Sequence, residues 1–233
     1  MNQMTRTIAP TLGLPGGYDV HKVREDFPIL SRTVYNHPLV YLDSAASAQK
    51  PKAVIEAMRR CMEEEYANVH RGVHYLSART TDRFEQAREC VRCFINARSS
   101  KEIVYTRGAT EAVNLVAASW GRKFLKEGDE VVLTELEHHA NIVPWQMLRA
   151  EKGIVLKVVP INDAGELMME EFEKLLSERT RLVAVSHMSN ALGTVNPIGT
   201  IIDMAHARGI PVLVDGCQAI THQPVDVTAL DVD

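Results

Sequence analysis

Cysteine is scarce in this chain, with four among 233 residues: Cys61, Cys90, Cys93 and Cys217. So few cysteines in a chain of this length do not make a disulfide framework, so we expect reduced thiols. Cys90 and Cys93 have the spacing of a metal or redox pair. Because no second pair lies nearby and the surrounding pattern is helical, we favour helix residues over that alternative.

An excess of positive charge and long apolar runs are also lacking. The formal net charge is −4, which argues against nucleic acid or an anionic membrane as the main partner. No apolar run is long enough to span a bilayer, and residues 1–10 contain no apolar segment of a signal peptide. We therefore expect a soluble cytoplasmic protein that acts on a small polar substrate.

What the chain does have is enough apolar sequence for one large domain, since 45% of its residues are hydrophobic. Glycine and proline punctuate residues 10–17, so residues 1–18 are expected to be a flexible lead and 19–233 the domain. Residues 229–233 begin another alternating strand and stop, which indicates a domain that is incomplete at its C-terminus.

Apolar runs alternate with helical patterns along the chain. Asp19 is expected to cap a short helix that ends before Pro28, and Pro51 to open another helix. Further helices are expected at 81–95, 110–124, 142–151, 168–176 and 198–208. Strands are expected at 39–43, 103–106, 131–134, 154–159, 182–186 and 211–215. This alternation, with near-continuous Val, Ile and Leu strands, predicts an α/β fold with a mostly parallel sheet covered by helices.

Ligands of open parallel sheets gather beyond the carboxyl ends of the strands, so the residues after each strand are candidates for a site. After 103–106, Gly108 lets the backbone approach a ligand, and a helix begins at Thr110. The amides of Ala109 and Thr110, the Thr110 hydroxyl and the helix dipole suit a phosphate group. The alternative is that Thr110 only caps the helix.

The adjacent His138 and His139 follow the next expected strand. Zinc needs three or four ligands, and the only nearby acids are Glu135 and Glu137, so a zinc site is disfavoured. A structural histidine is a second interpretation. The pattern favours a third, an imidazole ring that stacks on a planar cofactor and can relay protons near neutral pH.

Asp215 ends the apolar run 212–214. A carboxylate at this position is costly to bury without a partner, and the protonated nitrogen of a pyridine ring is such a partner. Its charge would keep the ring protonated and able to draw electrons from a substrate carbanion, with Gln218 in reach of the phenolic oxygen. These features predict pyridoxal phosphate. A helix cap or a Mg²⁺ ligand is the alternative for Asp215, although the chain has no Walker A segment.

Six segments of the chain resemble the SufS-type cysteine desulfurases, in order and with their spacings kept from about residue 20 to the end. They are YLDSAASAQKP (41–51), NVHRGVH (68–74), RGATE (107–111), EHHANIVPW (137–145), SNALGT (189–194) and DGCQA (215–219). The resemblance implies the large domain of type I pyridoxal-phosphate enzymes, a three-layer α/β sandwich with a mostly parallel sheet, here truncated. It also implies a homodimer.

The resemblance implies cofactor roles for six residues, one of which, Asn190, would also bind the substrate. Ala109 and Thr110 would bind the cofactor phosphate, and Gln218 would bind its phenolic oxygen. The catalytic residues would be His138, stacked on the pyridine ring, and Asp215, paired with the ring nitrogen. Ala109 stands where many relatives have threonine, but backbone amides can still hold a phosphate.

The substrate pocket is implied by the same resemblance. Asn190 would lie beside both the phenolic oxygen of the cofactor and the carboxylate of the substrate. Ala45, Ala46 and His70 would face the substrate, with His70 and Arg71 close to the partner of the homodimer. No metal ligand is implied.

The activity implied is conversion of L-cysteine to L-alanine, with the sulfur passed to an enzyme persulfide for iron–sulfur cluster assembly. A sulfur-acceptor protein of the SufE or SufU type would be the partner, and L-selenocysteine a further substrate. In the family, the lysine that binds the cofactor and the persulfide cysteine lie past the position of residue 233. Since Lys157 lies inside a strand and Cys217 is not the family's nucleophile, the chain alone is expected to be inactive. A selenocysteine lyase, a cysteine-sulfinate desulfinase and a non-enzymatic remnant are the alternatives.

Overall fold

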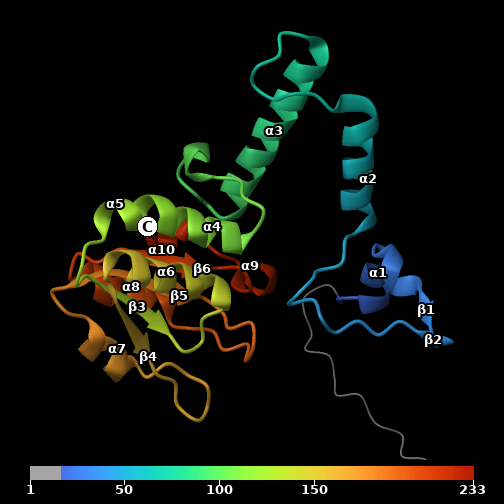
Figure 1. The fold of residues 1–233 in the computed structure, drawn as a ribbon. Coiled ribbons are helices and arrows are strands. Elements are labelled where there is room, and N and C mark those ends of the chain that lie inside the picture. Colours follow the sequence, from blue (N-terminus) through green and yellow to red (C-terminus); the bar gives the residue numbers. More distant parts are fainter. Residues whose placement is uncertain (1–16) are drawn as a thin grey trace, which may run out of the picture. The chain divides into compact units, whose positions relative to one another are not determined.

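The structure is a computed structural model that describes residues 17–233, so nearly all of the expected lead at 1–18 lies outside the described residues. The chain divides into two compact units, one ending at Thr81 and the other covering Asp82–Asp233. Helix α3 (Tyr75–Phe94) spans the division (Figure 1). The single domain expected at 19–233 stays a prediction.

The first unit consists of short elements. They are α1 (Val20–Glu25), the 3₁₀ turn η1 (Pro28–Ser31), β1 (Thr33–Val34), β2 (His37–Pro38), α2 (Lys52–Arg60) and the π-helical turn η2 (Cys61–Glu65). Asp19 caps α1 as expected, because its Oδ1 accepts from the backbone N–H groups of His21 and Lys22 at 3.0 and 3.1 Å. Pro51 directly precedes α2, which confirms the second expected start.

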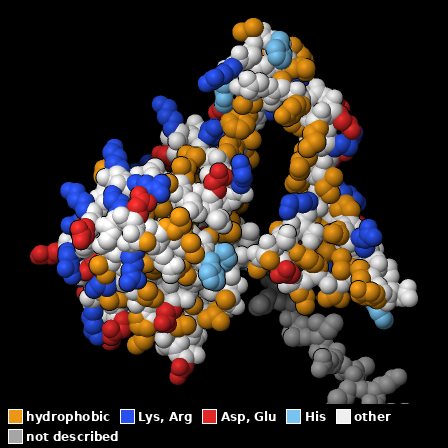
Figure 2. All heavy atoms as spheres, viewed as in Figure 1, with side chains coloured by type: hydrophobic (Ala, Val, Ile, Leu, Met, Phe, Trp, Pro, Cys, Tyr) orange, Lys and Arg blue, Asp and Glu red, His pale blue; other side chains and the backbone are white. Residues whose placement is uncertain are grey.

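The strand expected at 39–43 is wrong. Strands β1 and β2 pair antiparallel just before it, and residues 39–43 have no strand partner in the described chain. Val40 and Leu42 are 75% and 91% exposed, so these apolar side chains do not pack against a second layer of the described chain. Apolar side chains also gather on the surface along α2 (Figure 2), where Val54, Ile55 and Met58 are exposed.

The second unit is built on a four-stranded parallel sheet with the order β4-β3-β5-β6 (Figure 1). Its strands are β3 (Glu130–Thr134), β4 (Val155–Val159), β5 (Thr180–Ser186) and β6 (Val212–Asp215). Its helices are α4 (Ala109–Val116), α5 (Arg122–Phe124), α6 (Val143–Lys152), α7 (Met169–Leu175), α8 (Ile198–His206), α9 (Ala219–His222) and α10 (Val227–Leu230). Shorter turns are η3 (Ser100–Glu102), η4 (Ala117–Gly121) and η5 (His139–Asn141). These strands match four of the expected ones.

Helices cover both faces of this sheet. On one face, Val131 and Leu133 of β3 pack with residues of α4, η4 and α6, including the fully buried Trp145. On the other face, Val132 packs with Phe172 of α7 and the isoleucines of α8. Successive side chains of a strand point to opposite faces, so a strand covered on both faces must be apolar throughout. The expected three-layer α/β sandwich with a parallel sheet is confirmed.

Two further expected strands are wrong. Residues 103–106 pair with no strand in the described chain, and Val104 and Tyr105 are exposed. Residues 229–233 do not begin a strand, because helix α10 covers 227–230. Asp226 caps this helix, its carboxylate accepting from the N–H of Ala229 at 2.7 Å, and Leu230 and Val232 pack on the core. The alternating apolar residues thus belong to the last turn of α10 and to the residues that follow it.

A buried acid begins strand β3. The side chain of Glu130 is 1% exposed and accepts from the Ser177 hydroxyl at 2.7 Å, with Arg179 at 3.1 Å and the Lys157 ammonium at 3.6 Å. Burial opposes ionisation, but the bond from Ser177 and the charges of Lys157 and Arg179 hold the pKa of Glu130 below its usual value. Lys157 is thus engaged at the amino end of the sheet.

No helix within residues 17–233 is both long and apolar enough to cross a membrane.

An ion pair joins helix α8 to the residues after α10. His206 Nε2 lies 2.8 Å from Oδ2 of Asp233, which also accepts from the N–H of Val212 at 2.9 Å. The hydrogen bond to Asp233 raises the pKa of His206. A raised histidine pKa stabilises the fold fully below the unfolded-state pKa, and this contribution is lost as pH rises through the folded-state pKa.

We therefore predict that the free energy of unfolding falls as pH rises through the neutral range, by a few tenths to about 1 kcal/mol from this pair. Urea titrations of the wild type and of His206→Gln at a series of pH values measure the difference. The variant should lose this pH dependence. An unchanged profile in His206→Gln would show that the pair contributes nothing.

Candidate functional site

Three neighbouring strands end at one edge of the sheet. Strands β5 and β6 end together, since Ser186 pairs in register with Asp215, and β3 runs parallel to β5. His138 follows β3, Asn190 follows β5, and Gln218 follows Asp215 at the end of β6. The structure therefore brings four of the expected cofactor residues to the segments at the carboxyl edge. That their side chains surround one ring stays a prediction.

A fourth candidate segment begins helix α4. Gly108 precedes it with φ 156°, a conformation that favours glycine, and no atom lies within 4 Å of where its Cβ would stand. The first backbone N–H groups of α4, from Ala109 and Thr110, have no partner within the helix and receive no side-chain cap. Helix α4 lies against η5, the turn that follows His138. The glycine and the uncapped amides form an open donor cradle beside that turn.

The ring of His138 is exposed, and a hydrogen bond from the backbone fixes its orientation. Its Nδ1 accepts from the backbone N–H of Ala140 at 3.1 Å. In a neutral ring the proton therefore resides on Nε2. The His139 ring is perpendicular to it, with centroids 6.1 Å apart. One imidazole is thus presented to solvent with a defined tautomer.

Asp215 is half-buried at the last position of β6. Its Oδ1 accepts from the N–H of Cys217 at 3.0 Å, and its backbone carbonyl accepts from the N–H of His187 at 2.9 Å. Desolvation, and then the charge of Asp215, raises the pKa of the Cys217 thiol. Since the thiolate is the reactive form of cysteine, Cys217 is not an activated nucleophile.

Sequence reasoning missed Glu137, which lies between β3 and η5. Its carboxylate is buried, with the residue only 8% exposed, and burial raises its pKa while four hydrogen bonds oppose that shift. The available signal was an acid followed closely by Asn141 at the end of a buried strand. In the sequence pattern, Glu137 figures only as an acid near the disfavoured zinc site. No group of three or more potential metal-ligating side chains occurs in residues 17–233.

The three substrate-pocket candidates Ala45, Ala46 and His70 are exposed in the first unit. His70 has φ 67°, and its N–H donates to the Thr81 hydroxyl at 2.9 Å. Few residues other than glycine adopt this left-handed backbone, so the turn is held by its surroundings. Their role beside the cofactor stays a prediction.

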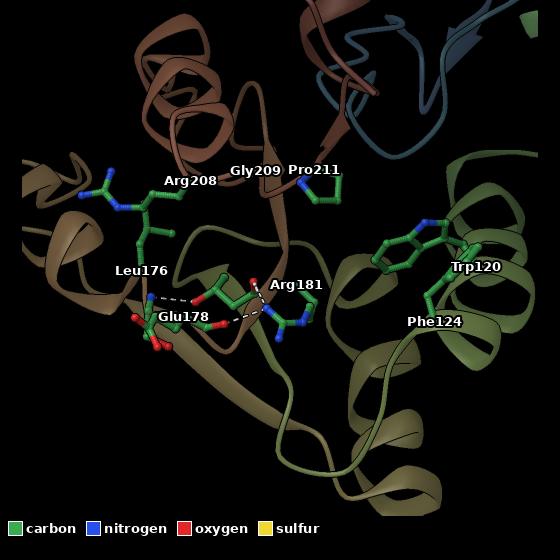
Figure 3. Close-up of a pocket in the computed structure, with 10 residues that line it drawn as sticks. Trp120, Phe124, Leu176, Glu178, Arg181, Arg208, Gly209 and Pro211 are labelled. Carbon is green, nitrogen blue, oxygen red and sulfur yellow. Dashed lines mark hydrogen bonds between the residues drawn. The ribbon is translucent and has the colours of Figure 1, made fainter.

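A cavity of about 570 Å³ lies at the opposite, amino edge of the sheet. Trp120 and Phe124 lie on one side of it and Leu176 and Arg208 on the other (Figure 3). Thr180, which begins β5, also lines it, so this cavity is separate from the residues at the carboxyl edge.

Comparison with known proteins defines the class. Residues 40–233 match the model of the aminotransferase class-V family, so the chain belongs to that family, which uses pyridoxal phosphate. It is 58% identical to a cysteine desulfurase of Dickeya dadantii, over 93% of this chain and 52% of that protein.

Two further relatives agree. A cysteine desulfurase of Synechococcus elongatus is 52% identical over 99% of this chain and 38% of its own length. The solved apo structure of a cysteine desulfurase from Thermococcus onnurineus matches with a TM-score of 0.85 and 36% identity, over 94% of this chain and 53% of that one. The fold is thus that of these pyridoxal-phosphate enzymes, and the chain spans about half the length of such relatives.

Cys217 offers a test of the charge on Asp215. Because Asp215 helps to raise the pKa of this thiol, Asp215→Asn should speed alkylation of Cys217 by iodoacetamide near neutral pH. Peptide mass spectrometry at timed intervals gives the rate, with Cys93 as the internal reference. An equal or slower rate in the variant would contradict an ionised Asp215 beside the thiol.

Proposed function

We propose that this chain carries the cofactor-binding part of a cysteine desulfurase, which converts L-cysteine to L-alanine. The sulfur passes to a cysteine thiol of the enzyme as a persulfide that supplies iron–sulfur cluster assembly. The observation that carries the proposal is the common carboxyl edge of the sheet. Asp215 ends β6 there, and the segments that carry His138 and Asn190 leave β3 and β5 there. Family membership and the cysteine desulfurase relatives support it.

The residues at this edge fit pyridoxal phosphate. The uncapped N–H groups of Ala109 and Thr110 and the Thr110 hydroxyl suit a dianionic phosphate, and open space remains beside Gly108. An exposed imidazole, His138, suits one face of a pyridine ring, and the half-buried carboxylate of Asp215 suits its nitrogen. Ala109 contributes only its backbone N–H to the cradle.

Each residue then has a distinct task. Asp215 would keep the pyridine nitrogen protonated, and pyridoxal phosphate, when bound, would supply the electron sink for the substrate carbon. His138 covers the ring and offers Nε2 for proton exchange. Gln218 donates to the phenolic oxygen, and Asn190 orients that oxygen and the substrate carboxylate.

The first unit supplies the substrate side in this proposal. Ala45, Ala46 and His70 face the substrate in this proposal, and the two alanines leave room for a small side chain. Homodimer formation, a sulfur acceptor of the SufE or SufU type, and action on L-selenocysteine are further parts of the proposal. So is a cytoplasmic location.

A chimera tests the proposal. Residues 20–233 replace the matching part of the Dickeya relative, whose remaining half supplies the lysine and the persulfide cysteine that the resemblance places past residue 233. With L-cysteine, pyridoxal phosphate and dithiothreitol, the chimera should form alanine and sulfide in equal amounts. A chimera that folds as a dimer and yields neither product would refute the proposed function.

Asp215→Asn in this chimera should lower turnover by on the order of 10²–10³, the usual cost of losing one preorganised electrostatic partner. The matched control is Asp203→Asn, an exposed aspartate of α8, which should turn over at the unaltered rate. Alanine formation is measured for both. Similar rates in the two variants would remove the assigned role of Asp215.

A further inference from the structure

Glu137 has four hydrogen-bond donors on its carboxylate. Oε1 accepts from the hydroxyl of Thr134 at 2.6 Å and from the backbone N–H of Ser186 at 2.9 Å. Oε2 accepts from the Asn141 amide and from the Ser186 hydroxyl, both at 2.7 Å. A buried carboxylate with all its acceptor sites filled is a rigid junction.

The donors come from three segments of the carboxyl edge. Thr134 ends β3, Ser186 ends β5, and Asn141 belongs to η5. Glu137 therefore connects two strand ends to the turn that carries His138. Each of these partners is itself buried, so water does not compete for the bonds.

Two of the donors cannot exchange roles. The Ser186 N–H is a backbone donor, and the Asn141 amide nitrogen must face Glu137 because Asn141 Oδ1 accepts from the indole N–H of Trp145 at 3.1 Å. One fixed donor meets Oε1 and the other meets Oε2. The site therefore requires two acceptor oxygens, which glutamate has and glutamine lacks.

The same turn orients His138. The N–H of Asn141 donates to the His138 carbonyl at 2.8 Å, and the N–H of Ala140 donates to its Nδ1 at 3.1 Å. Asn141 is clamped by Glu137 on one side and by Trp145 on the other. A loosened clamp would move the Ala140 amide away from the imidazole.

We propose that Glu137 is the positioning residue of the site, fixing the orientation of His138 and keeping its neutral ring in the Nε2–H tautomer. Through the proposed function, this holds the ring flat against the cofactor with Nε2 as the only nitrogen open to proton exchange. Glu137 touches neither cofactor nor substrate in this role and acts through the 138–141 turn.

The test compares Glu137→Gln with Glu130→Gln in the chain as it stands. Glu130 is a matched control, since it is also buried and hydrogen-bonded, but it begins β3 at the amino end whereas Glu137 follows the carboxyl end of β3. Histidine labelled with ¹⁵N in the ring reports the tautomer, read in a pH series where the ring nitrogen shifts no longer change with rising pH. Loss of a signal set in His138→Asn assigns the ring of His138.

In the wild type and in Glu130→Gln, the two ring nitrogens of His138 should be well separated, with the proton on Nε2. In Glu137→Gln they should move toward a common average, as both tautomers become populated. Lower urea midpoints are expected for both variants. A wild-type tautomer in Glu137→Gln, or an equal change in Glu130→Gln, would overturn the proposal.

A milder variant covers the case in which Glu137→Gln does not fold. Ser186→Ala removes one hydroxyl donor and keeps both fixed donors, so it should shift the His138 nitrogens partway in the same direction; unchanged nitrogens would overturn the proposal. Addition of pyridoxal phosphate to the chimera of residues 20–233 with the Dickeya half, which carries the lysine, is a separate arm. If the tautomer behaves as expected but the His138 ring protons of the chimera do not respond to the cofactor, the proposed function fails and the positioning role stands.

Discussion

Burial of strand β3 on both faces is the constraint on which the second unit depends. Its five residues are all buried, between helices α4–α6 on one face and α7–α8 on the other. A polar group at either end of such a strand must find partners inside the protein. Glu130 meets this need at the amino end with a hydroxyl and two cations. Glu137 meets it just past the carboxyl end with four uncharged donors.

The sequence predicted the strands that are covered on both faces, because such strands are apolar nearly throughout. It failed at 39–43 and 103–106, which are also apolar runs, and at 229–233, where apolar residues alternate; no described strand lies alongside these segments. A strand needs a ladder partner from a distant part of the chain, and local patterning does not report one. The β1–β2 hairpin was missed because its strands have only two residues each.

The candidate site divides in the same way. Thr110, His138, Asp215 and Gln218 were predictable because they follow strands or begin helices, and chain order fixes those positions. Glu137 was not, since its importance arises from Ser186, 49 residues away. Ala45, Ala46 and His70 belong to another unit, and no local pattern relates them to the sheet edge.

The separation between Glu137 and Ser186 also bears on the order of folding. A chain synthesised from its N-terminus presents β3 and the His138 turn before β5 exists, and during that interval the Glu137 carboxylate has only its local donors. Burying a carboxylate that lacks two of its four donors is costly. Burial of the carboxyl end of β3 is therefore unfavourable until β5 supplies the Ser186 donors. Docking of β5 against β3 thus supplies the Ser186 donors and orients the imidazole in a single non-local step.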